Sequence, residues 1–208
     1  TLNLMRKNKI ISNYYTVKVN KRIPVFAGLG GGSSNAATVF QFLNKKKTKK
    51  TTNDYILKKI GSDLRLFSFD KGFLKNLTNI QKIKKKHNLF FLLIYPKIKC
   101  STRDIYSLVK KYSKKNIFPE KNLVSKKNFI YYLINQKNDL QSIIEKKHPK
   151  IKKLIKSLTE TKGCYFSRIT GSGSTCYGLY SNQKWSKVAL NSLRKKYPNY
   201  WFSIAKTI

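Results

Sequence analysis

The most constraining feature of the sequence is a run of small residues at positions 28–34, Gly-Leu-Gly-Gly-Gly-Ser-Ser. Apolar residues recur at helical spacing over residues 36–43, so we predict a helix with Ser33 or Ser34 as its N-cap. Glycines leave no Cβ in the way and accept left-handed conformations, so several N–H groups can converge on one anion. The helix N-terminus adds unpaired donors and a positive dipole end. The run therefore predicts a phosphate-binding loop.

The spacing of this loop separates it from the commonest phosphate loops. It fits neither the G-x-G-x-x-G pattern of dinucleotide folds nor the Walker pattern of NTPases. A flexible linker is the alternative, but residues 14–20 alternate bulky apolar and polar side chains as a half-buried strand does, and a patterned helix follows. We therefore predict a unit of strand, glycine loop and helix.

The net charge of +37 would ordinarily favour a nucleic-acid or membrane partner. Nearly all basic residues are lysine, however, whereas nucleic-acid recognition favours the arginine fork. The lysines are scattered along the chain, and Lys, Asn, Ile, Tyr and Phe are enriched together, as adenine- and thymine-rich codons would produce. We expect a solvated basic surface, with no nucleic-acid partner.

Cysteine usage and hydropathy narrow the class of protein further. Cys100, Cys164 and Cys176 lie far apart with no C-x-x-C pair, which argues against a disulfide framework or a zinc site, so no protein-held metal is predicted. The longest apolar run, residues 89–94, is too short to span a membrane and is expected to be a buried strand. We expect a cytoplasmic protein with no membrane partner.

The rest of the chain mixes helical and strand patterns without strict alternation, which predicts an α+β fold. The basic stretch 82–86 is the expected boundary between domains at 1–86 and 87–208. Strands are expected at residues 64–69, 89–95, 175–180 and 201–205, and helices at residues 54–60, 104–112, 129–135, 150–161 and 185–196. Residues 164–169 lead into the second glycine-rich run at residues 170–174.

Two motifs resemble those of a known family. Residues 24–37 resemble the second motif of the GHMP kinases, which act on galactose, homoserine, mevalonate and phosphomevalonate, and the triple glycine is typical of the branch that phosphorylates 4-diphosphocytidyl-2-C-methyl-D-erythritol. Residues 168–174, Arg-Ile-Thr-Gly-Ser-Gly-Ser, are similar to that family's C-terminal glycine loop, which lies against the first. The resemblance covers nearly the whole chain. It implies a two-domain fold, with an N-terminal ATP-binding domain of a type shared with a ribosomal protein and a ferredoxin-like C-terminal domain.

The resemblance also implies which residues bind the nucleotide, ATP with Mg²⁺. The phosphate loop would consist of Pro24, Val25, Phe26, Ala27, Gly28, Leu29, Gly30, Gly31, Gly32, Ser33 and Ser34. The supporting glycine loop would consist of Thr170, Gly171, Ser172, Gly173 and Ser174.

Further matches imply the residues that act on the acceptor, a small cytidine-diphosphate-linked sugar alcohol. Asp63, in the Ile-Gly-Ser-Asp segment, is the implied catalytic base, although alone it would read as a loop-capping aspartate. Thr102 and Tyr106 would bind the substrate, with Tyr106 stacking on its cytosine ring, and the alternative for Tyr106 is a core residue. Residues 138–140, Asn-Asp-Leu, match a segment that we interpret as structural support.

The implied activity is transfer of the γ-phosphoryl group of ATP to the 2-hydroxyl group of the acceptor, a step of the non-mevalonate isoprenoid pathway. The family's N-terminal lysine-bearing strand and its aromatic and histidine have no counterpart before Pro24, so we expect an N-terminally truncated chain that cannot catalyse by itself. Another kinase of the superfamily, a basic RNA-associated protein and a degenerate remnant stay open as alternatives. The sequence does not determine the oligomeric state.

Overall fold

The computed structural model describes residues 1–44, 50–61, 64–68, 72–76, 79–83, 86–113, 119 and 124–207. They form two compact units, one made of Thr1–Val25 with Gly30–Lys84 and the other of Phe26–Leu29 with Lys85–Ile208. Four residues from the middle of the predicted phosphate loop therefore pack with the second unit, although the chain on both sides of them belongs to the first.

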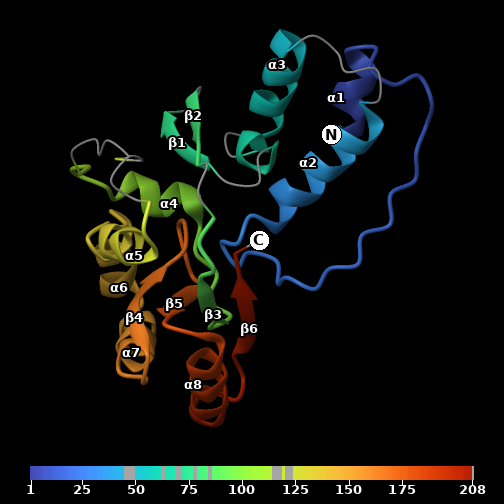
Figure 1. Cartoon of the computed structure of the whole chain (residues 1–208). Coiled ribbons are helices and arrows are strands. Elements are labelled where there is room, and N and C mark those ends of the chain that lie inside the picture. Colours follow the sequence, from blue (N-terminus) through green and yellow to red (C-terminus); the bar gives the residue numbers. More distant parts are fainter. Residues whose placement is uncertain are drawn as a thin grey trace. The chain divides into compact units, whose positions relative to one another are not determined.

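The second unit is built on a four-stranded antiparallel sheet with the strand order β4-β5-β3-β6 (Figure 1). Its strands are β3 (Phe90–Tyr95), β4 (Cys164–Ile169), β5 (Cys176–Tyr180) and β6 (Trp201–Lys206). Helix α7 (Pro149–Thr159) precedes β4, and α8 (Gln183–Lys196) precedes β6. This β-α-β-β-α-β connectivity confirms the expected ferredoxin-like fold.

Side chains alternate between the two faces of the sheet, and each face has its own core. On one face Leu92 and Ile94 of β3 pack with residues of α7 and α8, including Leu154 and Leu193. The opposite face buries Leu89, Ile130, Phe166 and Leu179 in a cluster that includes α5 (Lys126–Ile134). The apolar run of β3 is continuous because both of its faces are covered.

Side chains cap several helices of this unit. Ser101 accepts a hydrogen bond from the Asp104 backbone N–H at the start of α4 (Thr102–Ser107). Ser125 and Asn182 do the same for α5 and α8. Helix α6 (Gln141–Lys147) follows α5, and its Ile144 side chain is buried in the core. These caps determine the residue at which each helix begins.

The first unit is mostly helical. It contains α1 (Leu2–Lys7), α2 (Gly31–Leu43), α3 (Lys50–Ile60), the 3₁₀ helix η1 (Leu64–Ser68) and a hairpin of β1 (Gly72–Asn76) and β2 (Asn79–Lys82). Met5, Phe40, Ile56 and Leu64 are buried together in its core. This core anchors α2, the helix that follows the phosphate loop.

Two predicted strands are wrong. Residues 14–20 are irregular chain, with Val17 and Val19 left 44% and 46% exposed. An alternating apolar and polar pattern suits a strand, but a strand also needs a neighbour for its backbone hydrogen bonds. The described strands of this unit, β1 and β2, pair with each other instead. Residues 64–68 form η1 with Leu64 buried, because a short apolar run fits a helical turn as well as a strand.

The remaining predicted helices and strands agree in type with the described elements and differ at their ends. The described elements without a sequence prediction are α1, β1, β2, α6 and β4. Helix α3 begins four residues earlier than expected, and α4 ends five residues earlier than residue 112. None of the helices in the described ranges is both long and apolar enough to cross a membrane.

Candidate active site

The glycine loop at residues 170–174 is a tight turn between β4 and β5. The Thr170 N–H donates to the Thr175 carbonyl at 2.9 Å, and the Gly173 N–H donates back to the Thr170 carbonyl at 2.9 Å. Gly171 and Gly173 have φ values of 54° and 84°, which other residues adopt only under strain. The loop thus depends on glycine for its backbone conformation.

Phe26–Leu29 of the phosphate loop packs directly on this turn. The Thr170 hydroxyl donates to the Gly28 carbonyl at 3.1 Å, and the Thr175 N–H donates to the Ala27 carbonyl at 3.3 Å. Gly28 has a φ of 71°, and a Cβ there would overlap the Gly173 carbonyl oxygen. Residues that the sequence separates by about 140 positions are therefore in backbone contact.

Phe26 is the second unusual residue of this segment. Its φ of 62° is strained for an aromatic residue, and its side chain is 64% exposed, beneath the Lys99 ammonium at 5.7 Å from the ring centroid. Such strain is often found at binding sites, where surrounding contacts hold it in place. Here the bonds to the glycine loop at Ala27 and Gly28 hold it.

The remaining part of the phosphate loop begins α2 in the first unit. Gly30, with a φ of 64°, is the N-cap rather than Ser33 or Ser34, so the predicted cap is wrong by three or four residues. The helix starts earlier because glycine at position 30 supplies the required left-handed turn. Both serines thereby become first-turn residues of α2, beside its N–H groups.

The N-terminus of α2 has the properties of an anion site. Among the described residues no side chain caps it, and its first turn carries no acidic residue. A Cβ placed on Gly32 would meet no described atom within 4 Å, so the backbone there is open to a ligand. The Lys21 ammonium lies 3.8 Å from the position of a Cβ on Gly31. Free donors, the helix dipole and this lysine all favour a phosphate. Sequence reasoning missed Lys21, because lysine is so abundant in this chain.

The predicted substrate residues lie on α4 in the second unit. The Thr102 and Ser172 hydroxyl groups are hydrogen-bonded at 2.8 Å, which joins α4 to the glycine loop. Tyr106 is 50% exposed and lines a cavity of about 510 Å³. The cavity is lined by Tyr106, Tyr112, Leu133, Gln136, Lys137, Asn138, Asp139, Leu140, Arg168, Ile169, Thr170, Gly171 and Tyr177. Its aromatic rings, both signs of charge and amide groups suit a planar, polar ligand.

Two polar groups of this cavity have shifted acidity. Hydrogen bonds from Ser113 hold the pKa of the Asp139 carboxyl below its usual range, so this group is ionised at neutral pH. Burial raises the pKa of the Tyr177 hydroxyl, although the nearby Arg168 opposes the shift. Arg168 itself donates to the Leu133 and Ile134 carbonyls at 2.8 and 2.7 Å, at the last turn of α5. Hydrogen bonds thus hold the charged groups of Asp139 and Arg168 in place.

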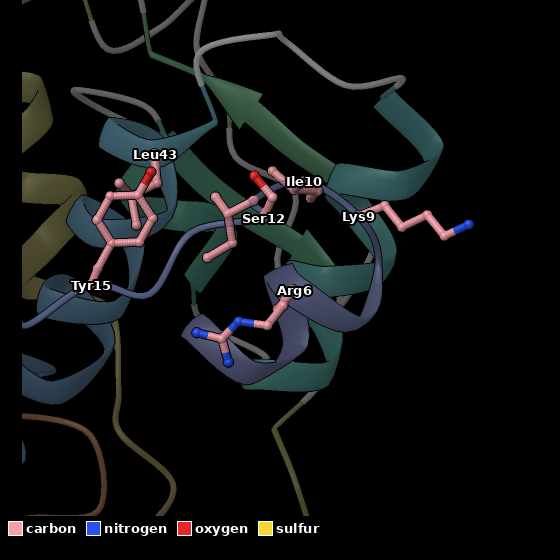
Figure 2. A pocket seen from close by; sticks show the side chains of 7 residues that line it. Arg6, Lys9, Ile10, Ser12, Tyr15 and Leu43 are labelled. Carbon is pink, nitrogen blue, oxygen red and sulfur yellow. The ribbon is translucent and has the colours of Figure 1, made fainter.

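A second cavity, also of about 510 Å³, lies in the first unit and contains none of the predicted site residues (Figure 2). Arg6, Lys9, Ser12 and Tyr15 are among its lining residues. Figure 2 shows Arg6 and Lys9 extending in different directions, so these two cations do not converge on one point. The Arg6 guanidinium instead lies over the Tyr14 ring at 4.0 Å.

The predicted catalytic base, Asp63, lies outside the described residues, and its role stays a prediction. Helix α3 ends at Ile60, and Gly61 donates its N–H to the Leu57 carbonyl at 3.0 Å. Within the described ranges, no group of three or more histidines, cysteines, aspartates or glutamates could bind a metal ion.

Comparison with known families gives two matches. Residues 1–65 match the model of the GHMP kinases N terminal domain, and residues 129–199 match the model of the GHMP kinases C terminal domain. The two matches contain the phosphate loop and the supporting glycine loop, respectively.

Three curated proteins that resemble this chain are each named 4-diphosphocytidyl-2-C-methyl-D-erythritol kinase. The protein of Pelagibacter ubique is 34% identical over 100% of this chain and 74% of its own length. That of Wolbachia pipientis is 32% identical over 96% of this chain and 70% of its own length. That of Buchnera aphidicola is 37% identical over 80% of this chain and 54% of its own length.

Solved structures support the fold. A crystal structure of 4-(cytidine 5'-diphospho)-2C-methyl-D-erythritol kinase matches with a TM-score of 0.69 at 21% identity, covering 88% of this chain and 68% of that chain. Homoserine kinase from Cytophaga hutchinsonii matches with a TM-score of 0.64 at 14% identity, covering 90% of this chain and 68% of that chain.

Proposed function

The chain belongs to the 4-diphosphocytidyl-2-C-methyl-D-erythritol kinase family of the GHMP kinases, and on that premise we propose the reaction that it catalyses. It transfers the γ-phosphoryl group of ATP to the 2-hydroxyl group of 4-diphosphocytidyl-2-C-methyl-D-erythritol, in the non-mevalonate pathway to isoprenoid precursors. The single observation that carries this proposal is the uncapped, glycine-rich N-terminus of α2. This helix begins three residues after Gly28, whose carbonyl accepts a hydrogen bond from Thr170.

Phosphate binding follows from the first turn of α2. The N–H groups of Gly31, Gly32 and Ser33 have no carbonyl four residues earlier within the helix, so they are donors for phosphate oxygens. Lys21 adds a positive charge beside them. These groups are in place before the reaction begins, so they stabilise developing negative charge without reorganisation.

Magnesium fits this site as a companion of the nucleotide. Mg²⁺ neutralises charge on the phosphate oxygens when it is bound. The ion prefers oxygen ligands and usually keeps several waters, and Ser33 and Ser34 are the hydroxyl residues of the α2 first turn. These two serines would hold the ion when it is bound together with the nucleotide.

The acceptor needs a base and a binding surface. The Asp63 carboxylate takes the proton of the 2-hydroxyl group, the oxygen bonds to the γ-phosphorus, and the bond to ADP breaks. Tyr106 offers an exposed aromatic face at the cavity of the second unit, which suits a cytosine ring. Thr102 lies one helical turn before Tyr106 and is fixed by Ser172.

The test is transfer of phosphate by the full-length protein that contains this sequence. ³¹P NMR should show one new phosphate ester on the 2-hydroxyl group of the acceptor, and no transfer to homoserine or mevalonate. Asp63→Asn should lower kcat by about 10²- to 10⁴-fold and leave the Kd for ATP unchanged.

Asp54→Asn is the matched control, because Asp54 of α3 forms an ion pair with Arg65 of η1 at 3.2 Å. The pair is partly buried, so its loss should lower stability by about 1 kcal/mol, but kcat should change by less than about threefold. Equal kcat values for the two variants would refute Asp63 as the base, and phosphorylation of a different alcohol would refute the acceptor.

A further inference from the structure

The turn between α5 and α6 holds the glycine loop through one side chain. The Asn138 amide donates to the Gly171 carbonyl at 2.9 Å and to the Ile169 carbonyl at 3.3 Å. Its oxygen accepts the Leu140 N–H at 3.0 Å, which fixes the turn itself. One residue therefore ties the start of α6 to a loop about 30 positions further along the chain.

The next residue holds the other side of the same cavity. The Asp139 carboxylate accepts hydrogen bonds from the Ser113 backbone N–H at 3.0 Å and from the Ser113 hydroxyl. Ser113 belongs to the segment that follows α4, the helix of Tyr106. The α5–α6 turn thus contacts both the glycine loop and the segment leaving α4.

A third contact joins α4 directly to the glycine loop. Thr102, at the start of α4, is hydrogen-bonded to Ser172 of the glycine loop at 2.8 Å. Helix α4 is therefore held at its start by the loop and beyond its end by Asp139. Tyr106 lies between these two attachments and lines the cavity that Asn138, Asp139 and Gly171 also line.

We propose that Asn138 and Asp139 are positioning residues: Asn138 holds the glycine loop in the conformation needed for nucleotide binding, and Asp139 holds α4 in the position needed for acceptor binding. The proposal rests on the proposed function, which assigns ATP to the phosphate loop that contains Gly28 and the acceptor to α4. Asn138 acts on the nucleotide side, since the loop that it holds braces Gly28. Asp139 acts on the acceptor side, through Ser113 and α4.

The hydrogen bonds at positions 138 and 139 require a neutral amide at the first position and a carboxylate at the second. An aspartate at position 138 would keep the acceptor for the Leu140 N–H, lose both donors, and place a negative charge against two carbonyl oxygens. An asparagine at position 139 would present an amide N–H₂ group or a weaker neutral acceptor to Ser113. Both substitutions preserve volume, so they test hydrogen bonding rather than packing.

The experiment measures dissociation constants by calorimetry for Asn138→Asp and Asp139→Asn in the full-length protein, with ATP·Mg²⁺ and with the cytidine-diphosphate acceptor. Asn138→Asp should raise the Kd for ATP about tenfold and that for the acceptor less than threefold. Asp139→Asn should show the opposite pattern, with a fivefold or larger rise for the acceptor at about 1 kcal/mol per lost bond.

Substitutions at two exposed residues, Asn135 and Glu160, are the controls. Asn135→Asp makes the same chemical change at a residue whose amide donates to the Tyr131 carbonyl of α5 and not to the glycine loop. Glu160→Gln removes a carboxylate that pairs with Lys156 at 3.8 Å on α7. Neither should change either Kd, and the melting temperatures of all four variants report any general loss of stability.

Equal rises of both constants in both variants, or a lower melting temperature with unchanged constants, would overturn the positioning proposal, since a merely structural role predicts one of those results. Failure of the proposed function looks different. A wild-type protein that binds ATP but transfers no phosphate to the acceptor contradicts the function, whereas the Kd for ATP of Asn138→Asp still decides the nucleotide side.

Discussion

The two glycine segments of this protein use glycine for different purposes. In the loop at residues 170–174, Gly171 and Gly173 supply left-handed backbone, and the turn is held by hydrogen bonds from Thr170 to Thr175, from Gly173 to Thr170 and from Asn138 to Gly171. At the start of α2, Gly31 and Gly32 are already helical, and Gly32 faces open space among the described residues. The first segment therefore supports the site, and the second gives a ligand access to backbone donors.

Gly28 is the point where the supporting role should be most sensitive. Gly28→Ala adds a Cβ that overlaps the Gly173 carbonyl, in a backbone conformation that alanine resists. The free energy of unfolding measured with urea should fall by about 3 kcal/mol, and the Kd for ATP should rise with it. A change below about 0.5 kcal/mol would show that the two loops are not in fixed contact.

Thr170 provides a milder test of the same contact. Thr170→Val removes the hydroxyl that donates to the Gly28 carbonyl, so the free energy of unfolding should fall by about 1 kcal/mol. Thr38→Val is the control, because the Thr38 hydroxyl only bonds the Ser34 carbonyl within α2, and it should have a smaller effect. Similar losses for the two variants would argue against a special role of Thr170.

Substitution of Lys21 tests whether the start of α2 is where the nucleotide binds. Lys21→Ala removes a cation beside the first turn of α2, so the Kd for ATP should rise about fivefold at low salt and less at 0.5 M salt. Lys18→Ala changes an equally exposed lysine and should leave the Kd unchanged. Equal effects of the two substitutions would mean that only the overall charge attracts the nucleotide.

Gly32 should respond in the opposite direction from Gly28. Gly32→Ala places a methyl group in open space within a helix, so thermal unfolding should show about 0.5–1 kcal/mol of added stability. The Kd for ATP should nevertheless rise, because the methyl group covers the backbone that phosphate approaches. Tighter ATP binding by this variant would place the phosphate elsewhere.

The sequence was sufficient for features that local chemistry determines. Glycines before an apolar helical pattern predict a glycine-rich turn at the start of a helix, and α2 begins at Gly31. The helix α7 was found because Ile151, Leu154, Ile155 and Leu158 recur at helical spacing and are buried together. The ferredoxin-like order of the second unit followed from the resemblance and is confirmed by the strand pairing.

Features that depend on distant partners could not be predicted in this way. The alternation at residues 14–20 is a real pattern, but a strand forms only where another strand pairs with it. The N-cap was misplaced because serine is the commoner cap, while Gly30 reaches the left-handed conformation more easily. Asn138 was interpreted only as support, and its bond to Gly171 becomes visible only once β4 brings the loop alongside.

The most direct test of the division between support and access is amide NMR during a titration with ATP·Mg²⁺. We predict the largest chemical-shift changes at the N–H groups of Gly31, Gly32 and Ser33, at the start of α2. Smaller changes are expected at Gly171 and Gly173, which hold the turn rather than the phosphate. Large changes at Gly171 and Gly173, with none at the start of α2, would contradict the account.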